Sequence, residues 1–180
     1  GWPERAALFQ EHALALLEAA ATEALSKAGL TPQDVDTVVA VSTTGITTPS
    51  LDAHLLNSLG FRSDINRLPI FGLGCVGGVT GMARAADMAK TRPGQTVLLL
   101  VVELCALTFR PQELTKANII ASALFGDGAA AIVLRSGQED GASARYLGSA
   151  EHTWPNSLGI MGWRVEDDGL GVIFSRDIPT

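Results

Sequence analysis

Apolar and polar residues follow two different periods along the chain, and the period changes at glycine and proline residues. Apolar residues in 4–28 recur at three- and four-residue spacing, with Pro3 near the first turn and Gly29 after the last. This spacing predicts an amphipathic helix. The run "TVLLLVVE" at 96–103 is apolar without interruption, which is typical of a strand buried on both faces. The chain therefore combines helices with buried strands.

The same pattern predicts the remaining elements. In chain order they are a strand at 35–41, a helix at 51–59 closed by Gly60, a strand at 68–71, a helix from about Cys75 to Lys90, a helix at 116–126, a strand at 129–136, a surface loop at 139–143, a strand at 144–150, a loop at 151–169 and a strand at 170–174. Because strands alternate with helices, this order predicts an α/β fold with a mainly parallel or mixed sheet and helices on both faces. Sites in such sheets lie at the carboxyl ends of strands.

Composition narrows the range of partners. The 180 residues are 47% hydrophobic and 18% charged, which fits one domain with a sizeable core. A net charge of −6 without a basic stripe argues against a nucleic-acid partner. We expect no membrane partner, because no apolar run reaches the ~18 residues of a membrane span. The first 30 residues do not have the pattern of a signal peptide either.

The cysteines and histidines bear on the redox compartment and on metal binding. Cys75 and Cys105 are the only two cysteines, which favours a reducing cytoplasm over a disulfide scaffold. The three histidines are scattered and form no zinc-binding spacing with the cysteines, so we expect no metal site. His152 and the acidic pair Asp167 and Asp168 read as parts of a solvated loop.

The segment "LPIFGLGCVGGVTGMARAADMAK" at 68–90 places Cys75 among glycines at the end of a predicted strand. A sharp turn there puts the thiol at the start of the next helix. The helix dipole and unpaired backbone N–H groups at that position favour a thiolate and can hold an oxyanion. This is the arrangement of a nucleophile elbow, with sulfur in place of a serine oxygen. The alternative is a small buried cysteine whose neighbouring glycines only allow close packing of helix on sheet.

Four stretches add a family resemblance: "TTGITTPSLD", "GCVGG", "VVELCALTF" and "ASALFGDGAAAIVL". Their order and spacing resemble those of type III polyketide synthases, the chalcone-synthase-like enzymes of the thiolase superfamily. "IMGWRVEDDGLGVIFSRDIP" resembles the bacterial branch. The resemblance implies the N-terminal half of a thiolase-like layered fold, with a mixed five-stranded-type sheet. Residues 1–180 would then be a single partial domain, in which 151–180 begin the link to a C-terminal half.

The resemblance also implies an acyltransferase. Such enzymes load an acyl group from a CoA thioester onto a cysteine and extend it by decarboxylative condensation with malonyl-CoA, without a further cofactor. Cys75 matches the nucleophile. Phe125 matches the phenylalanine beside it that positions the malonyl group for loss of CO2, although without the family we would prefer plain core packing for this ring.

Further residues match positions that line the cavity of the growing chain: Thr43, Thr48, Cys105, Thr108, Gly162 and Val172. Thr48 matches the position that reaches across a homodimer into the partner's cavity, and Val172 falls near the place where plant members of the family have a second gatekeeper phenylalanine. For Cys105, a strand-end core residue is an equally good reading. Asp127 reads as structural, at a turn before a buried strand.

The family's catalytic histidine and asparagine have no match here, and neither do its CoA-binding basic residues. We therefore expect them outside this sequence, and we expect these 180 residues alone to be inactive in turnover. Two alternatives remain open. One is a ketoacyl-ACP synthase III-like or other thiolase-superfamily condensing enzyme, because "FGDGAAA" also occurs there. The other is a domain that kept the fold and lost the chemistry.

Overall fold

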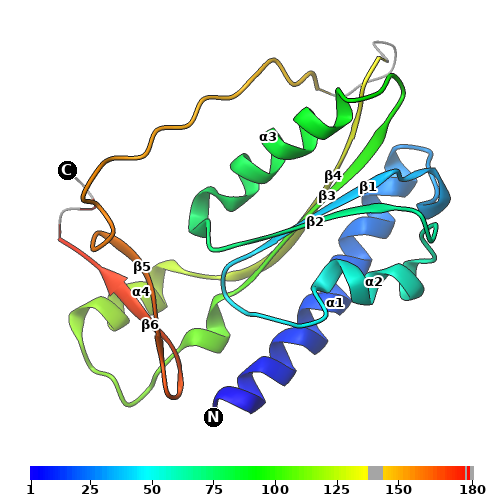
Figure 1. Ribbon diagram of the computed structural model, residues 1–180. Coiled ribbons are helices and arrows are strands. Elements are labelled where there is room, and N and C mark those ends of the chain that lie inside the picture. The colour runs from blue at the N-terminus through cyan, green and yellow to red at the C-terminus, as the bar shows by residue number, and fades with distance from the viewer. Residues whose placement is uncertain (138–143, 177, 179–180) are drawn as a thin grey trace.

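The computed structural model describes residues 1–137, 144–176 and 178 (Figure 1). Its helices and strands are α1 (Trp2–Lys27), β1 (Thr37–Ser42), α2 (Leu51–Leu59), β2 (Asn66–Phe71), α3 (Gly77–Ala89), β3 (Thr96–Leu104), α4 (Lys116–Leu124), β4 (Asp127–Arg135), β5 (Met161–Glu166) and β6 (Gly169–Phe174). Short 3-10 turns lie at Pro32–Asp34, Gly74–Val76 and Cys105–Thr108. The surface loop predicted at 139–143 lies outside the described residues.

The main sheet is mixed, with the strand order β2-β1-β3-β4. β1 runs parallel to both β2 and β3, whereas β4 runs antiparallel to β3. β5 and β6 pair antiparallel in a separate two-stranded sheet. The prediction of an α/β fold with a mixed sheet is confirmed. The expected five-strand count is not met among the described residues, where the main sheet has four strands.

Two predictions late in the chain are wrong. Residues 144–150 form no strand, and Leu147 among them is 90% exposed; none of the described strands pairs with this segment to stabilise an extended conformation. Conversely, the predicted loop contains strand β5. This strand forms because it pairs with β6 across a tight turn, where Gly169 adopts a φ of 145°. The polar and glycine-rich composition of the hairpin is typical of a loop, which is why the sequence did not predict β5.

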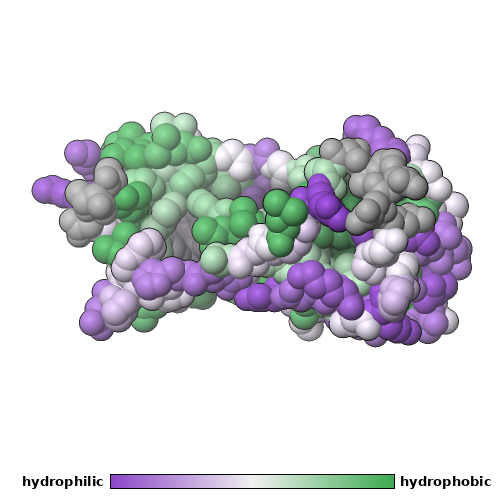
Figure 2. Space-filling view, turned by 90° about the horizontal axis from the view of Figure 1, so that it is seen from above, coloured by the Kyte–Doolittle hydropathy of each residue, from purple (hydrophilic) through white to green (hydrophobic). Residues whose placement is uncertain are grey.

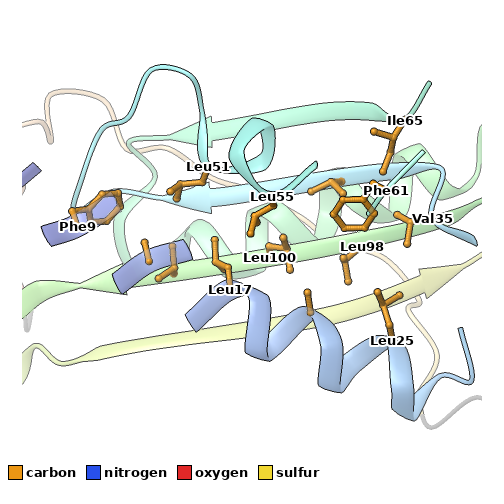
Figure 3. Close-up of a cluster of buried hydrophobic side chains, with 14 of the residues drawn as sticks. Phe9, Leu17, Leu25, Val35, Leu51, Leu55, Phe61, Ile65, Leu98 and Leu100 are labelled. Carbon is orange, nitrogen blue, oxygen red and sulfur yellow. The ribbon is translucent and has the colours of Figure 1, made fainter. Parts of the chain in front are cut away.

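Helices cover both faces of the main sheet, as predicted (Figure 1). On one face, Leu17 of α1 and Leu55 of α2 meet Leu100 of β3, and Phe9 of α1 and Leu98 of β3 lie further along the same buried cluster (Figure 3). All of these side chains are at most 2% exposed. Each buried leucine stabilises the fold by roughly 2 kcal/mol relative to an exposed one. The long apolar face of α1 thus fixes the sheet that carries the candidate site.

Helix α3 lies on the opposite face, very close to β1. A Cβ at Gly77 would come within 2.9 Å of Val41 Cγ1, and one at Gly81 within 2.7 Å of Val41 Cγ2 and 3.1 Å of Leu99. Only glycine permits this approach in a close-packed interior. The first turn of α3, and the Cys75 turn before it, are therefore held against the carboxyl end of β1.

Apolar residues also gather on the surface, at the end of the molecule that carries α4 and the β5–β6 pair (Figure 1, Figure 2). Leu114, Ile119 and Leu124, in and just before α4, are 82%, 57% and 67% exposed. An exposed apolar patch of this kind marks a surface suited to association. It is not a membrane span, since none of the described helices is long and apolar enough to cross a bilayer.

Candidate active site

Cys75 lies in a turn between β2 and α3 and is exposed. The turn is the 3-10 segment Gly74–Val76, and α3 begins at Gly77, slightly later than predicted. The difference arises because the first turn closes with a bond from the Gly77 N–H to the Gly74 carbonyl, which is the tighter 3-10 pattern. Gly72 and Gly74 adopt φ values of 88° and 56°, which glycine reaches without strain. The chain thereby lifts the thiol out at the end of a strand.

Thr43 connects this turn to β1. Its hydroxyl oxygen accepts a hydrogen bond from the Gly74 backbone N–H at 2.9 Å. The Thr43 side chain was predicted to line a cavity, but the residue is only 6% exposed and its hydroxyl is engaged by the turn. We therefore assign it a second task, which is to fix the backbone immediately before Cys75.

Glu103 is a site residue that the sequence analysis missed. Its carboxylate accepts from the Thr43 N–H at 3.0 and 3.1 Å, from the Thr44 N–H at 2.9 Å and from the Thr44 hydroxyl at 2.7 Å. The Ser42 hydroxyl lies 3.5 Å away. The signal was present in the sequence, because a glutamate that interrupts an apolar strand must find hydrogen-bond donors when it is buried. Glu103 locks the end of β1, from which Thr43 reaches the Cys75 turn.

Cys105 follows β3 directly and is partly buried. Burial raises the pKa of its thiol to about 11, and the carboxylates of Glu103 and Asp127 and the sulfur of Cys75 add to the increase. Cys105 therefore remains a neutral thiol near pH 7. In this environment it acts as a small apolar side chain next to Cys75 and not as a second nucleophile.

The turn after β3 is fixed by two hydrogen bonds. The Asp127 carboxylate accepts from the Ala106 N–H at 2.8 Å, and the Thr108 hydroxyl donates to the Cys105 carbonyl at 2.7 Å. Asp127 thus has a structural role, as predicted, although its partner lies on another element and not in its own turn. Thr108 was predicted to line the cavity, and its hydroxyl is occupied by this backbone bond.

Phe125 sits where α4 ends, just before β4. Its ring meets Trp163 of β5 edge to face at a centroid distance of 5.9 Å and Phe174 of β6 at 6.3 Å. In the register of the sheet, Asp127 at the start of β4 lies opposite Leu104 at the end of β3. Phe125 therefore enters the site from the strand end that carries Cys105.

The other predicted cavity residues fall into two places. Gly162 and Val172 are partly buried on the β5–β6 hairpin, and Val172 pairs with Trp163, which contacts Phe125. Thr48 is exposed in the loop between β1 and α2, and it shares no hydrogen bond or ring contact with the other site residues that the structure describes. Thr43, Cys75, Cys105 and Phe125 thus lie at the same end of the main sheet, where β1, β2 and β3 end and β4 begins. Thr48 lies outside that group.

The histidines lie elsewhere in the fold. His12 is on α1, His54 is on α2, and the ring of His152 packs edge to face on Trp154 at 5.1 Å. Across the part of the chain that the structure describes, no three His, Cys, Asp or Glu side chains form a group able to hold a metal ion. The described site residues supply a thiol, backbone N–H groups and an aromatic ring at this end of the sheet.

A cysteine on a glycine turn at the carboxyl end of a mixed sheet, with helices on both faces of that sheet, resembles the arrangement of a thiolase-type condensing enzyme. Comparison with solved structures agrees. The crystal structure of 1,3,6,8-tetrahydroxynaphthalene synthase from Streptomyces coelicolor, a bacterial type III polyketide synthase, superimposes with a TM-score of 0.94 at 30% identity over 99% of this chain and 51% of that one. Germicidin synthase from the same organism gives 0.92 at 32% identity, over 96% and 45%.

Residues 2–138 match the family described as chalcone and stilbene synthases, N-terminal domain, and the chain belongs to that family. A 1,3,6,8-tetrahydroxynaphthalene synthase from Streptomyces peucetius is 44% identical over 92% of this chain and 45% of the relative. A putative chalcone synthase from Bacillus subtilis is 40% identical over 98% and 52%. The chain thus spans about half the length of the curated relatives it matches.

Proposed function

We propose that this chain carries the acyl-accepting cysteine of a type III polyketide synthase. One observation carries the proposal: the Cys75 thiol is exposed on a turn at the carboxyl end of β2, and Thr43 fixes the backbone just before it. An exposed thiol before a helix N-terminus suits a nucleophile, because the helix dipole favours negative charge there. Family membership and the names of the relatives support the reaction class.

In the loading step, the Cys75 thiolate attacks the carbonyl carbon of an acyl-CoA. A tetrahedral oxyanion forms, and we expect backbone N–H groups near the start of α3 that have no intrahelical partner to stabilise it. The carbon–sulfur bond to CoA then breaks, and CoA leaves as a thiolate that takes up a proton. The product is an acyl thioester on Cys75.

In the extension step, malonyl-CoA loses CO2 and the resulting enolate attacks the Cys75 thioester, which releases the Cys75 thiolate. The partly buried Phe125 ring supports this step, since loss of the carboxylate charge is favoured where water is scarce. The histidine and asparagine that such a reaction employs in the family would come from residues outside these 180. The same holds for the basic groups that bind CoA phosphates. We therefore propose that these 180 residues alone accept an acyl group without turning over.

Mass spectrometry after incubation with short- and long-chain acyl-CoA esters tests the loading step. The 180-residue chain and the product of the whole gene are compared, each as wild type, Cys75→Ala and Cys105→Ala. We expect an acyl adduct in the wild type and in Cys105→Ala, and none in Cys75→Ala. An unmodified Cys75 in the whole gene product, or an adduct that persists in Cys75→Ala, would contradict the proposal.

We further propose a cytoplasmic homodimer in which Thr48 contacts the partner subunit. The exposed position of Thr48 in the β1–α2 loop supports this arrangement. Sedimentation of the whole gene product is expected to show a dimer, and Thr48→Arg is expected to weaken it. A monomer in the wild type would rule out this part of the proposal while leaving the chemistry at Cys75 untouched.

A further inference from the structure

A nearly buried guanidinium joins two distant parts of the chain. The Arg110 side chain, just after the turn that holds Cys105, is 10% exposed and contacts three carboxylates. Glu113, in the same loop, lies 3.4 Å from Nη1. The other two partners, Glu166 on Nη1 and Asp168 on Nη2, are 56 and 58 residues away in the sequence. The sequence suggested that Asp168 is only part of a solvated loop, whereas the structure pairs it with Arg110.

Both distant carboxylates belong to the β5–β6 hairpin. Glu166 ends β5, and Asp168 lies in the turn before β6. The planar guanidinium presents its N–H groups as a fork, so its two terminal nitrogens can hold two carboxylates at once in a fixed geometry. Arg110 thus clamps the turn end of a two-stranded sheet. A two-stranded sheet by itself is only marginally stable in water.

The hairpin is shaped to let this contact form. A Cβ at Gly171 of β6 would lie 2.6 Å from Oε1 and 2.8 Å from Cδ of Glu166. The Glu166 side chain therefore occupies the space that any larger residue at 171 would fill. Arg164 binds the same Oε1 at 3.1 Å from the solvent side, where it is 64% exposed. Among the residues that the structure describes, Arg110 is the hydrogen-bond partner of the Glu166 side chain that lies outside the hairpin.

The clamp also reaches α4. The Arg110 carbonyl accepts a hydrogen bond from Asn118 Nδ2 at 2.9 Å, and Asn118 is buried in α4. Phe125 is the C-cap of that helix, and its ring packs on Trp163 and Phe174 of the hairpin. Arg110 therefore bonds both elements that position the Phe125 ring. Its backbone carbonyl binds α4, and its side chain binds the hairpin.

We propose that Arg110 is a positioning residue that fixes the Phe125 ring, at the strand end that carries Cys105, by clamping the β5–β6 hairpin against α4. The inference has a functional consequence that rests on the proposed function: the clamp serves the decarboxylative extension step and not the loading of Cys75. The placement of the ring, by contrast, is testable without any turnover.

The test uses Arg110→Gln and Arg110→Lys, with Arg164→Gln as the matched control that removes the exposed partner of Glu166. Gly171→Ala attacks the same contact from the hairpin and leaves Arg110 unchanged. Ring placement is measured in a Trp2→Phe/Trp154→Phe background, where Trp163 is the remaining tryptophan, by acrylamide quenching of its fluorescence. We expect quenching to rise severalfold in Arg110→Gln and Gly171→Ala, to rise less in Arg110→Lys, and to stay unchanged in Arg164→Gln.

Kinetics of the whole gene product then separate the steps. We expect Arg110→Gln to acylate Cys75 at the wild-type rate and to lose about tenfold or more in kcat for malonyl-CoA extension, with KM little changed. Equal losses in both steps, or quenching of Trp163 that no clamp variant alters, would overturn the proposal. If the wild type itself shows no extension, the proposed function fails, whereas the fluorescence result still decides whether Arg110 holds the ring.

Discussion

Cys75 and Cys105 carry the same functional group in opposite environments. Cys75 is exposed at a helix start, while Cys105 is partly buried between the carboxylates of Glu103 and Asp127, which contribute to raising its pKa. A low-dielectric site that already holds negative charge disfavours a second anion. Cys105 is thereby kept as a neutral thiol, so under the proposed function acylation would be confined to Cys75.

Alkylation by iodoacetamide should show this difference. With a pKa of about 11 against the ordinary 9.0, Cys105 in the wild type is expected to react about 100-fold more slowly at pH 8 than in the urea-unfolded chain, because only the thiolate reacts. Its reactivity should rise as the pH approaches 11. The folded state also loses stability as the pH rises above 9, where the unfolded thiol ionises first. Peptide mass mapping of the labelled cysteines is the measurement, and equal rates in the folded and unfolded chains would count against it.

Glu103 differs from both cysteines, because its contribution is to the backbone. Removing its carboxylate in Glu103→Ala leaves the Thr43 and Thr44 N–H groups without an acceptor near the end of β1. Each lost partner of a buried donor costs about 1 to 3 kcal/mol, so we expect a loss of roughly 3 kcal/mol in the free energy of unfolding in urea. Slower alkylation of Cys75 should accompany it, because Thr43 also holds Gly74. The exposed Glu11→Ala on α1 serves as the control and should change neither quantity.

At the scale of elements, some segments were readable from local pattern alone. The bounds predicted for α2 coincide with Leu51–Leu59, because Gly60 ends the helix in the left-handed conformation that glycine favours. β3 was equally clear from its unbroken apolar run. β5 was not, since its cause is pairing with β6 and the ion pairs of Glu166, and nothing in the local pattern of 161–166 reports them.

Close contact between α3 and β1 leads to a sharp prediction on two glycines of one helix. Gly81→Ala would place a methyl group 2.7 Å from Val41 Cγ2, and such overpacking of a close-packed interior costs about 1 to 3 kcal/mol. At Gly78 the nearest atom to the new Cβ is Val101 Cγ2 at 4.0 Å. Gly78→Ala is therefore expected to stabilise the helix by up to about 1 kcal/mol. Thermal unfolding of the two variants measures the difference, and equal effects would mean that α3 does not approach β1 so closely.

The hairpin should respond to acid. Hydrogen bonds from Arg110, and then from Arg164, lower the pKa of Glu166 below its ordinary 4.5. A carboxylate with a lowered folded pKa stabilises the folded state above the unfolded value, and that contribution is lost as the pH falls through the folded value. We expect the protection of the β5 and β6 amides, measured by hydrogen exchange relative to the intrinsic rate at each pH, to fall below pH 4.5 in the wild type. In Glu166→Gln, exchange should be faster already at pH 6 and should show no such step.

At the scale of the whole molecule, the limits of sequence reasoning follow from distance along the chain. The Cys75 turn was predictable because its glycines and its strand are neighbours in sequence. Glu103 meets its partners across about 60 residues, and Arg110 meets Glu166 across 56. A single sequence contains no local trace of such pairings. What it does contain is a charge placed where a charge is costly, such as Glu103 within an apolar strand.

The apolar surface at the α4 end leads to a prediction about the 180-residue chain as a whole. Leu114, Ile119 and Leu124 expose large aliphatic side chains close together along the sequence, and exposed apolar patches drive association in water. We expect this chain to self-associate with rising concentration and to bind a hydrophobic dye. Ile119→Lys should reduce both effects without lowering the unfolding temperature, because Ile119 is 57% exposed. Light scattering and dye fluorescence across a concentration series make the measurement. Leu16→Lys, a 39%-exposed position on α1, is the matched control, and an equal reduction there would show that association does not depend on the α4 surface.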